Sequence, residues 1–300
     1  MDEYEIKKQD TNRYKKLKKL LKKHYGYESF RPSQFKIIFN VIKQKDVCAV
    51  LPTGYGKSLC FQLPALYLKE PAIVISPLIA LMLDQQKSLE SKGITSCVYN
   101  STVKNKKELE NEIIEGKFKI IYITPESVKK CGWLLQKLHE NVGISLFAID
   151  EAHCISSFGF DFRSSYRELG KLREICEGIP ILAVTATATS KVINDIQTNM
   201  KMKDCETVIS SFDRPNLEIN VESKDSNTIK DIINMINSTD GSVIIYCVTK
   251  KDTEQLCTEL KTKNINCNIY HAGLKTKDRE RIQLEFMNNE IKCVIATIAF

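Results

Sequence analysis

Short apolar runs recur along the chain, and more polar stretches separate them. Most runs are rich in Val, Ile, Leu or Phe, which is typical of buried strands. In the first two thirds of the chain the runs lie at residues 47–50, 72–76, 95–100, 118–124, 144–149 and 179–185. Strands that alternate with helices indicate a parallel sheet, so the pattern predicts an α/β fold.

The alternation stops at SSFDRPN, residues 210–216, where polar residues cluster and Pro215 interrupts any helix. A second series follows, with a helix expected from about Thr228 to Ser238 and strands expected at 217–223, 241–250, 265–274 and 292–300. So few strands indicate an incomplete second lobe. The predicted parts are an N-terminal helix (1–25), a first lobe (26–209), a hinge (210–217) and a partial second lobe (218–300).

The segment YKKLKKLLKKHY, residues 14–25, predicts an amphipathic helix with Leu17, Leu20, Leu21 and His24 on one face and lysines on the other. Its lysine face could contact nucleic acid or a membrane surface. Alternatively, the lysines are solvated and the leucines pack on the next domain. We favour the second interpretation, because a run of charges is usually a solvated face.

Composition narrows the class of protein. Of the 300 residues, 43% are hydrophobic and 27% are charged, and no apolar run approaches the roughly 18 residues of a membrane span. The N-terminus lacks the apolar segment of a secretory signal, so we expect an intracellular protein without membrane contact. The eleven cysteines include no CxxC pair, which predicts reduced thiols and no zinc. The net charge of +7 leans toward a polyanionic partner.

The segment LPTGYGKS, residues 51–58, follows the first apolar run and predicts a nucleotide phosphate cradle. Glycines let backbone N–H groups close around phosphates, the lysine can reach the terminal phosphates, and the serine hydroxyl can bind Mg²⁺. The strict pattern has glycine where this chain has Leu51. An incidental glycine-rich turn is the weaker alternative. The expected ATP-binding residues are Thr53, Gly54, Tyr55, Gly56, Lys57 and Ser58.

Two adjacent acids, Asp150 and Glu151, follow the apolar run at 144–149 in the sequence DEAH. Acids at the end of a buried strand are costly unless they have a role. With a phosphate cradle upstream, Asp150 is expected to hold Mg²⁺, and Glu151 to orient and deprotonate water. His153 either relays the nucleotide state to the second lobe or forms a hydrogen bond within the core.

Three further groups of residues are candidates for contacts with the base or with nucleic acid. Tyr27, Arg31 and Gln34 combine an aromatic ring, a guanidinium and a carboxamide, a set that could bind adenine. The segment 154–169 carries aromatic rings beside charges, which suits stacking on unpaired bases but also a hydrophobic cluster under a loop. The candidates in the segment 154–169 are Phe158, Asp161, Phe162 and Arg163. Thr185 ends the apolar run at 179–185 and Thr187 follows two residues later, and their hydroxyls could bridge the DEAH acids to the second lobe.

Taken together, these motifs resemble those of the RecQ family of DNA helicases. The similar segments, in order, are GYESFRPSQ, LPTGYGKSLCFQLPAL, SPLIALMLDQ, DEAHCIS, TATAT, SFDRPN, IIYC, YHAGL and VIATIAF, which together span residues 26–300. The resemblance implies two RecA-like lobes that close on ATP and Mg²⁺. It also implies 3′ to 5′ movement along single-stranded DNA and unwinding of tailed duplex DNA, with residues 154–163 as the loop that couples the two activities.

The chain departs from the family pattern in two places. The coupling loop usually carries Trp and His where this chain has Phe158 and Phe160. The family also continues past ATIAF into a GMG segment and an arginine-bearing motif, and many members carry zinc-binding, winged-helix and HRDC regions. We therefore expect the 300-residue chain to bind ATP and single-stranded DNA but to hydrolyse ATP slowly and to unwind no duplex.

Two other functions stay open. A DEAH-type RNA helicase would share the cradle and the acids but would lack FRPSQ, the aromatic loop and SFDRPN. A fragment that binds nucleotide or DNA without turnover is the non-enzymatic alternative. The helicase interpretation places the protein in the nucleus of a eukaryote or in the cytoplasm otherwise.

Overall fold

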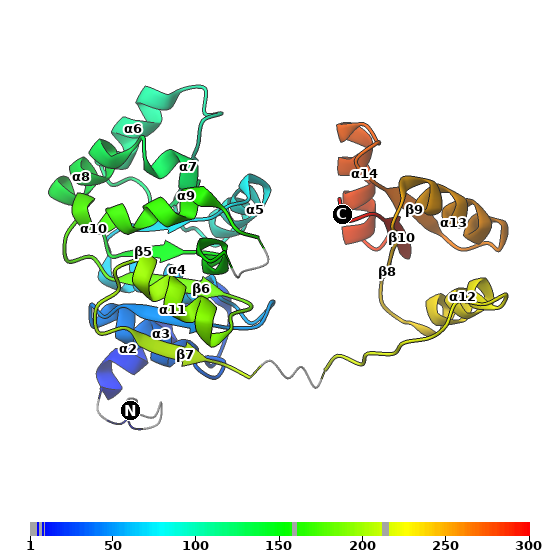
Figure 1. Ribbon diagram of the computed structural model, residues 1–300, viewed down its shortest axis with the longest axis horizontal. Helices are drawn as coiled ribbons and strands as arrows, with labels where there is room; N and C mark the ends of the chain where they lie inside the picture. Colours follow the sequence, from blue (N-terminus) through cyan, green and yellow to red (C-terminus); the bar gives the residue numbers. More distant parts are fainter. Residues whose placement is uncertain (1–4, 6–7, 9, 158–160, 212–215) are drawn as a thin grey trace. The chain divides into compact units, whose positions relative to one another are not determined.

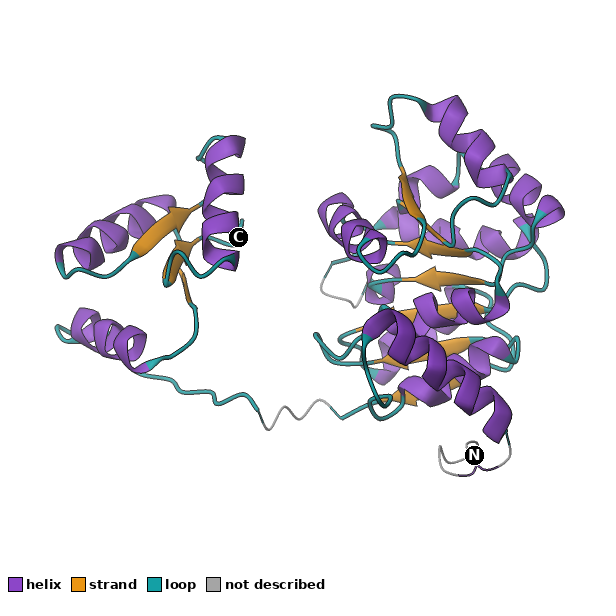
Figure 2. Ribbon diagram, turned by 180° about the vertical axis from the view of Figure 1, so that it is seen from behind, coloured by secondary structure: helices purple, strands orange, loops and turns teal. Residues whose placement is uncertain are grey.

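The computed structural model describes residues 5, 8, 10–157, 161–211 and 216–300. By its internal contacts the chain forms two compact units, residues 1–214 and 215–300 (Figure 1). Each unit contains a parallel β-sheet with helices packed against it (Figure 2). The α/β class predicted from the alternating pattern is confirmed.

The first unit has a seven-stranded sheet with the order β3-β4-β2-β5-β6-β1-β7. All its pairings are parallel, so the carboxyl ends of the strands share one edge. Six strands were expected from the apolar runs, and β7 was not. The strands are β1 (Val47–Val50), β2 (Ala72–Ile75), β3 (Ser96–Tyr99), β4 (Ile120–Ile123), β5 (Leu146–Ile149), β6 (Ile181–Thr185) and β7 (Glu206–Ile209).

Helices cover both faces of this sheet, which is why the strands read as continuous apolar runs. In β1, Val47 and Ala49 pack into one apolar layer while Cys48 and Val50 pack into the other. The principal helices are α2 (Thr11–Tyr25), α3 (Gln34–Ile42), α4 (Leu59–Leu68), α5 (Ile79–Glu90), α6 (Lys106–Ile114), α8 (Gly132–Asn141) and α11 (Ser190–Asn199). Shorter ones are α7 (Pro125–Val128), η1 (Ala152–Ile155), α9 (Ser164–Arg167), η2 (Glu168–Lys171) and α10 (Leu172–Ile175).

Helix α2 packs against α4 through its leucines. Leu17 and Leu21 are fully buried in the same apolar layer as α3 and α4. The Asp10 side chain accepts a hydrogen bond from the Arg13 N–H at the start of the helix, and Gly26 ends it in the left-handed conformation. The leucine face thus packs on the first unit, as the favoured interpretation of this segment predicts.

The second unit has a three-stranded parallel sheet with the order β8-β10-β9. Its strands are β8 (Val243–Tyr246), β9 (Cys267–Tyr270) and β10 (Cys293–Ala296), and its helices are α12 (Thr228–Ser238), α13 (Lys250–Thr262) and α14 (Thr276–Met287). The prediction of a strand at residues 217–223 is wrong. Ile219 and Val221 are 86% and 93% exposed, because no described strand pairs with this segment and a strand needs a hydrogen-bonding neighbour.

Candidate nucleotide-binding and hydrolysis site

The phosphate cradle lies between β1, which ends at Val50, and α4, which begins at Leu59. Gly54 and Gly56 have φ angles of +73° and +86°, a region that side chains with a Cβ rarely adopt. A Cβ at Gly56 would also lie 2.6 Å from Nε2 of Gln34. The backbone of this loop therefore requires glycine at both positions.

Leu51 accounts for the departure from the strict cradle pattern. Its side chain is fully buried in the apolar layer beneath α3 and α4, and its N–H donates to the Thr185 carbonyl at 2.9 Å. The position thus continues the pairing of β1 with β6 by one residue. A buried leucine serves this role, so glycine is not needed here.

Two of the three residues expected to bind adenine hold the cradle in shape. Gln34 Nε2 donates to the carbonyls of Tyr55 (3.0 Å) and Gly56 (3.3 Å), and Gln34 Oε1 accepts from the Arg31 N–H. Arg31 Nη1 donates to the Gly54 carbonyl at 2.5 Å, and the guanidinium lies 5.7 Å from the centre of the Tyr55 ring. The structure thus brings Arg31 and Gln34 onto the cradle backbone, a contact that sequence spacing alone did not reveal.

Cavities lie on both sides of the cradle. One, of about 360 Å³, is lined by Tyr27, Arg31 and Gln34 together with Tyr25, Ser29, Gly54, Gly56, Ser58, Leu59, Gln62, Ser88 and Lys92. The other, of about 170 Å³, brings the cradle and the DEAH acids together and is lined by Thr53, Lys57, Ser58, Phe61, Ser76, Leu81, Met82, Gln85, Tyr122, Asp150 and Glu151. Ser58 lines both.

The two acids differ in their protonation behaviour. Burial, and then the adjacent charge of Glu151, raise the pKa of Asp150 to about 6. The hydrogen bond with His153, and the positive charge of Lys57, lower the pKa of Glu151. Glu151 therefore stays ionised at neutral pH, while the buried Asp150 carboxylate would gain from a neighbouring cation.

His153 links Glu151 to the end of β6. Its Nδ1 lies 3.3 Å from Glu151 Oε2 and 2.9 Å from Thr185 Oγ1, and Thr185 Oγ1 in turn donates to the Thr187 carbonyl at 3.1 Å. The contact with the Cys154 thiol and the ion pair with Glu151 raise the pKa of His153 to about 9. The imidazole is thus positively charged at neutral pH and joins the DEAH acids to the threonine segment.

The aromatic segment after DEAH is anchored at both ends. The Arg163 N–H donates to the Cys154 carbonyl (3.0 Å), and Arg163 Nη1 donates to the Pro77 carbonyl (3.2 Å). Arg163 also forms an ion pair with Asp161 at 3.0 Å. Phe158 and Phe160, whose rings the sequence also predicts in this loop, lie outside the described residues.

The described aromatic rings of this segment differ in burial. Tyr166 is fully buried, and its hydroxyl donates to the backbone carbonyl of Asp150 at 2.8 Å, so this ring belongs to the core. Phe162 is 44% exposed, and the Arg167 guanidinium lies 4.9 Å from its ring centre. An exposed ring beside a guanidinium is available to stack on a base.

Sequence reasoning missed several polar residues around the site. Gln62 is buried in α4, where Oε1 accepts from the Tyr25 hydroxyl at 2.9 Å and Nε2 donates to Gln85 Oε1 at 3.2 Å. Ser76, at the end of β2, donates to Asp150 Oδ2 at 3.4 Å. A lone glutamine inside the apolar stretch LCFQLPAL was the available signal for Gln62, since a buried amide needs partners.

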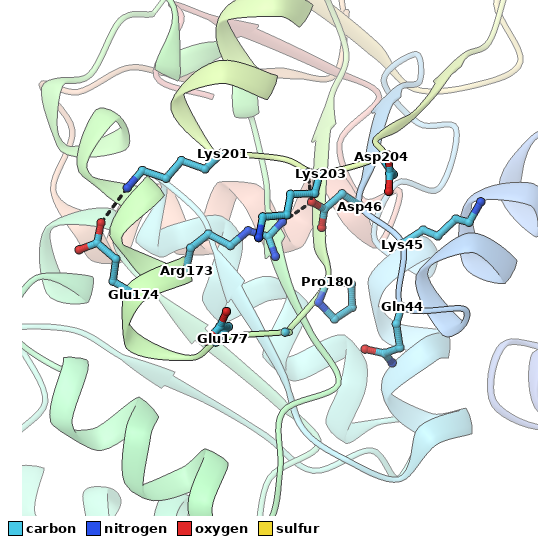
Figure 3. A pocket seen from close by; sticks show the side chains of 11 residues that line it. Gln44, Lys45, Asp46, Arg173, Glu174, Glu177, Pro180, Lys201, Lys203 and Asp204 are labelled. Atoms are coloured by element: carbon cyan, nitrogen blue, oxygen red, sulfur yellow. Dashed lines mark hydrogen bonds and ion pairs between the residues drawn. The ribbon is translucent and has the colours of Figure 1, made fainter.

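A larger cavity, of about 700 Å³, lies at the opposite edge of the sheet, before β1, β6 and β7 (Figure 3). Arg173 forms an ion pair there with the buried Asp46, whose carboxylate also accepts from the N–H groups of Ile181 (2.9 Å) and Lys203 (2.7 Å). These bonds tie α10 to the starts of three strands. None of the cradle or DEAH residues lines this cavity, so it is separate from the nucleotide site.

Comparison with known families decides the class of protein. The family described as "DEAD/DEAH box helicase" matches residues 31–196, and "Helicase conserved C-terminal domain" matches residues 226–300. The chain belongs to the DEAD/DEAH box helicases. This places it in helicase superfamily 2 and agrees with the cradle, the DEAH acids and the two parallel sheets.

Its relatives include DNA helicases named RecQ, so the resemblance seen in the motifs is confirmed. The chain is 38% identical to the ATP-dependent DNA helicase RecQ of Haemophilus influenzae, over 94% of the chain and 45% of that protein. It is 42% identical to the mouse bifunctional 3'-5' exonuclease/ATP-dependent helicase WRN, over 93% of the chain and 20% of that protein. It is 54% identical to the putative ATP-dependent RNA helicase R290 of Acanthamoeba polyphaga mimivirus, over 100% of the chain and 55% of that protein.

Solved structures support the two RecA-like sheets. The chain matches Saccharomyces cerevisiae Dbp5 with a TM-score of 0.72 at 20% identity, over 96% of the chain and 75% of that structure. It matches the helicase MrfA bound to DNA with a TM-score of 0.70 at 18% identity, over 94% of the chain and 44% of that structure. At these identities the match shows the fold. No helix in the described part of the chain combines the length and apolarity needed to span a bilayer.

Proposed function

We propose that this chain carries the motor of an ATP-dependent DNA helicase of RecQ type. In this proposal, ATP hydrolysis drives movement along single-stranded DNA in the 3′ to 5′ direction and unwinds tailed duplex DNA. The main support is that one cavity is lined by Lys57 and Ser58 of the cradle and by Asp150 and Glu151 of DEAH. The relatives named ATP-dependent DNA helicases support DNA as the substrate.

The residues of this cavity fit a divalent cation beside the phosphates. Mg²⁺ needs only one or two carboxylates, because phosphate oxygens and water complete its shell. Asp150 and the Ser58 hydroxyl would hold it, and a cation there would favour the ionised form of the buried Asp150. When bound, Mg²⁺ would neutralise charge on the phosphates and so lower the barrier to phosphoryl transfer.

Side chains and backbone groups of the chain would bind the phosphates and activate the attacking water. The cradle N–H groups and Lys57 bind the phosphates and fix them in line for attack. The ionised Glu151 orients a water molecule and accepts its proton, while His153 holds the Glu151 carboxylate from the side of β6. Any change in the position of His153 reaches Thr185 through their 2.9 Å hydrogen bond.

Nucleotide selection would lie in the cavity beside Tyr27. We infer that the exposed Tyr27 ring stacks on adenine and that Arg31 and Gln34 recognise its edge. Because Gln34 and Arg31 also hold the carbonyls of Gly54, Tyr55 and Gly56, base binding would be sensed directly by the phosphate cradle.

The coupling of nucleic acid to hydrolysis would rest on the aromatic segment. Phe158, Asp161, Phe162 and Arg163 would contact the unpaired strand. Arg163 reaches the Pro77 carbonyl after β2, and Tyr166 reaches the Asp150 carbonyl, so a shift of this segment acts on the catalytic edge of the sheet.

RNA unwinding is the second candidate function, because the relative with 54% identity is named an RNA helicase. ATPase rates measured with DNA and RNA single strands of the same sequence separate the two. DNA should stimulate the rate more strongly, and a 3′-tailed duplex should stimulate it more than a 5′-tailed one. Lys57→Ala is the control that must abolish both signals. Equal or stronger stimulation by RNA would overturn the DNA assignment.

A further inference from the structure

One helix carries a positive charge equal to the net charge of the whole chain. Residues 11–25, which form α2, contain Arg13, six lysines and no acidic residue. The whole chain has 44 Lys and Arg against 37 Asp and Glu, a net charge of +7. Without the seven cations of α2, the rest of the chain has 37 of each and no net charge. The polyanion signal in the composition therefore comes from α2.

The packing of α2 fixes where these charges point. Leu17 and Leu21 are buried against α4, so the opposite face is directed toward solvent. A stripe about 12 Å long results, since an α-helix rises about 1.5 Å per residue. The exposed lysines of this stripe are Lys15, Lys16, Lys19, Lys22 and Lys23.

Few acids offset the lysine stripe. Lys22 forms an ion pair with Glu28 at 2.7 Å, and within the described chain no ion pair involves the other four. Lys15 and Lys19 are four residues apart, as are Lys19 and Lys23, and like charges at this spacing destabilise a helix. A face needed only for solubility would gain stability from interspersed glutamates, so this stripe suits an anionic partner.

The partner is better matched by nucleic acid than by a membrane. A helix that binds a membrane surface inserts its apolar face among the lipids. In α2 that face is already occupied, since Leu17 and Leu21 lie in the core of the first unit and Leu20 packs against it. Only the charged face is available. A duplex presents about one phosphate charge per 1.7 Å of axis, so a 12 Å stripe faces about seven phosphate charges.

We propose that the lysine stripe of α2 is an accessory contact for the phosphate backbone of duplex nucleic acid. It would hold the duplex outside the ATP cavity and the aromatic segment and would be insensitive to base sequence. This inference rests on the proposed function in one respect, that the chain acts on nucleic acid. It adds a surface that the helicase motifs do not include.

The test compares two variants that lose equal charge. In the first, the stripe residues Lys15, Lys16, Lys19, Lys22 and Lys23 are replaced by Gln, which has a similar helix propensity. The control replaces five exposed lysines on or near α6 and α8, at the other end of the first unit (Figure 1). These are Lys104, Lys106, Lys107, Lys117 and Lys137. Circular dichroism and ATP titration should show that both variants fold and bind ATP like wild type.

Binding of a fluorescent blunt duplex is then measured by anisotropy between 50 and 200 mM salt. If four lysines contact phosphates, wild-type affinity should fall about a hundredfold more over this range than that of the stripe variant, from a slope difference of about 3.6. The control variant should keep the wild-type slope. Equal slopes for wild type and the stripe variant would overturn the inference, whereas absence of nucleic-acid binding by wild type would instead refute the proposed function.

Two further measurements test the choice of partner. Anionic vesicles of phosphatidylcholine and phosphatidylserine should not bind α2 more tightly than duplex, and vesicle binding that depends on the stripe without duplex binding would refute the choice of nucleic acid. A single strand of the same sequence should depend less on the stripe. A stripe variant that loses single-strand affinity but keeps duplex affinity would refute the duplex assignment.

Discussion

The two glycines of the cradle provide a matched pair of substitutions. Gly54 and Gly56 have similar positive φ angles, +73° and +86°. A Cβ at Gly54 would meet nothing within 4 Å, whereas one at Gly56 would lie 2.6 Å from Gln34 Nε2. Gly56→Ala and Gly54→Ala therefore share the backbone penalty and differ in their effect on Gln34.

The magnitude follows from what Gln34 would lose. Each alanine in the left-handed region costs about 1–2 kcal/mol. Gln34 is only 3% exposed and makes three hydrogen bonds, to the Arg31 N–H and to the carbonyls of Tyr55 and Gly56. Displacing its amide leaves buried polar groups unpaired, which costs about 1–3 kcal/mol more. The free-energy loss caused by Gly56→Ala should thus exceed that caused by Gly54→Ala by about 1–3 kcal/mol. This difference corresponds to about 5- to 150-fold in an equilibrium constant.

Both ATP binding and unfolding must be measured, because the penalty can fall on either. A cradle that stays in the observed conformation is strained, which lowers the free energy of unfolding. A cradle that relaxes must return to this conformation to bind phosphate, which lowers ATP affinity. Calorimetric titration with ATP and urea denaturation of the same samples give the two losses, and their sum is compared between variants.

A double variant isolates the role of Gln34. In a Gln34→Ala background the added Cβ at position 56 meets no amide, so Gly56→Ala should then cost only the backbone penalty seen for Gly54→Ala. Equal losses for the two single glycine variants would contradict the claim that Gln34 holds the cradle. So would an undiminished Gly56→Ala effect in the Gln34→Ala background.

Three other predictions follow from the site. The pKa of His153 is raised from 6.5 to about 9, so its stabilising contribution is complete below pH 6.5 and is lost as pH rises through 9. Urea denaturation between these pH values should show a falling free energy of unfolding in wild type and no such fall in His153→Gln. An identical fall in the variant would exclude the His153–Glu151 pair as its origin. Tyr166→Phe removes only the hydroxyl that donates to the Asp150 carbonyl and should lower the free energy of unfolding by about 1 kcal/mol, so unchanged denaturation would show that this bond is not formed in solution. Phe162→Ala should leave the melting temperature nearly unchanged, because the ring is 44% exposed. The same variant should abolish stimulation of the ATPase by single-stranded DNA. Retained stimulation would show that Phe162 does not couple DNA to hydrolysis.

Local patterns in the sequence determined the elements that carry the chemistry. Runs of apolar residues predicted six strands of the first sheet, because strands covered on both faces are apolar at nearly every position. The cradle and the DEAH acids were recognisable because their chemistry needs particular residues at adjacent positions. Strand β7 was not predicted, because Glu206 and Thr207 interrupt its apolar pattern. It lies at the edge of the sheet.

Contacts between distant segments were decided only by the tertiary structure. The bonds from Gln34 to the cradle, from Tyr166 to the Asp150 carbonyl and from His153 to Thr185 join residues that are 16 to 32 positions apart. Nothing in a linear pattern records which strands become neighbours, and strand order is what brings these segments to one edge of the sheet. The same limit explains the error at 217–223, where strand-like alternation is present but a strand forms only if another strand supplies its hydrogen bonds.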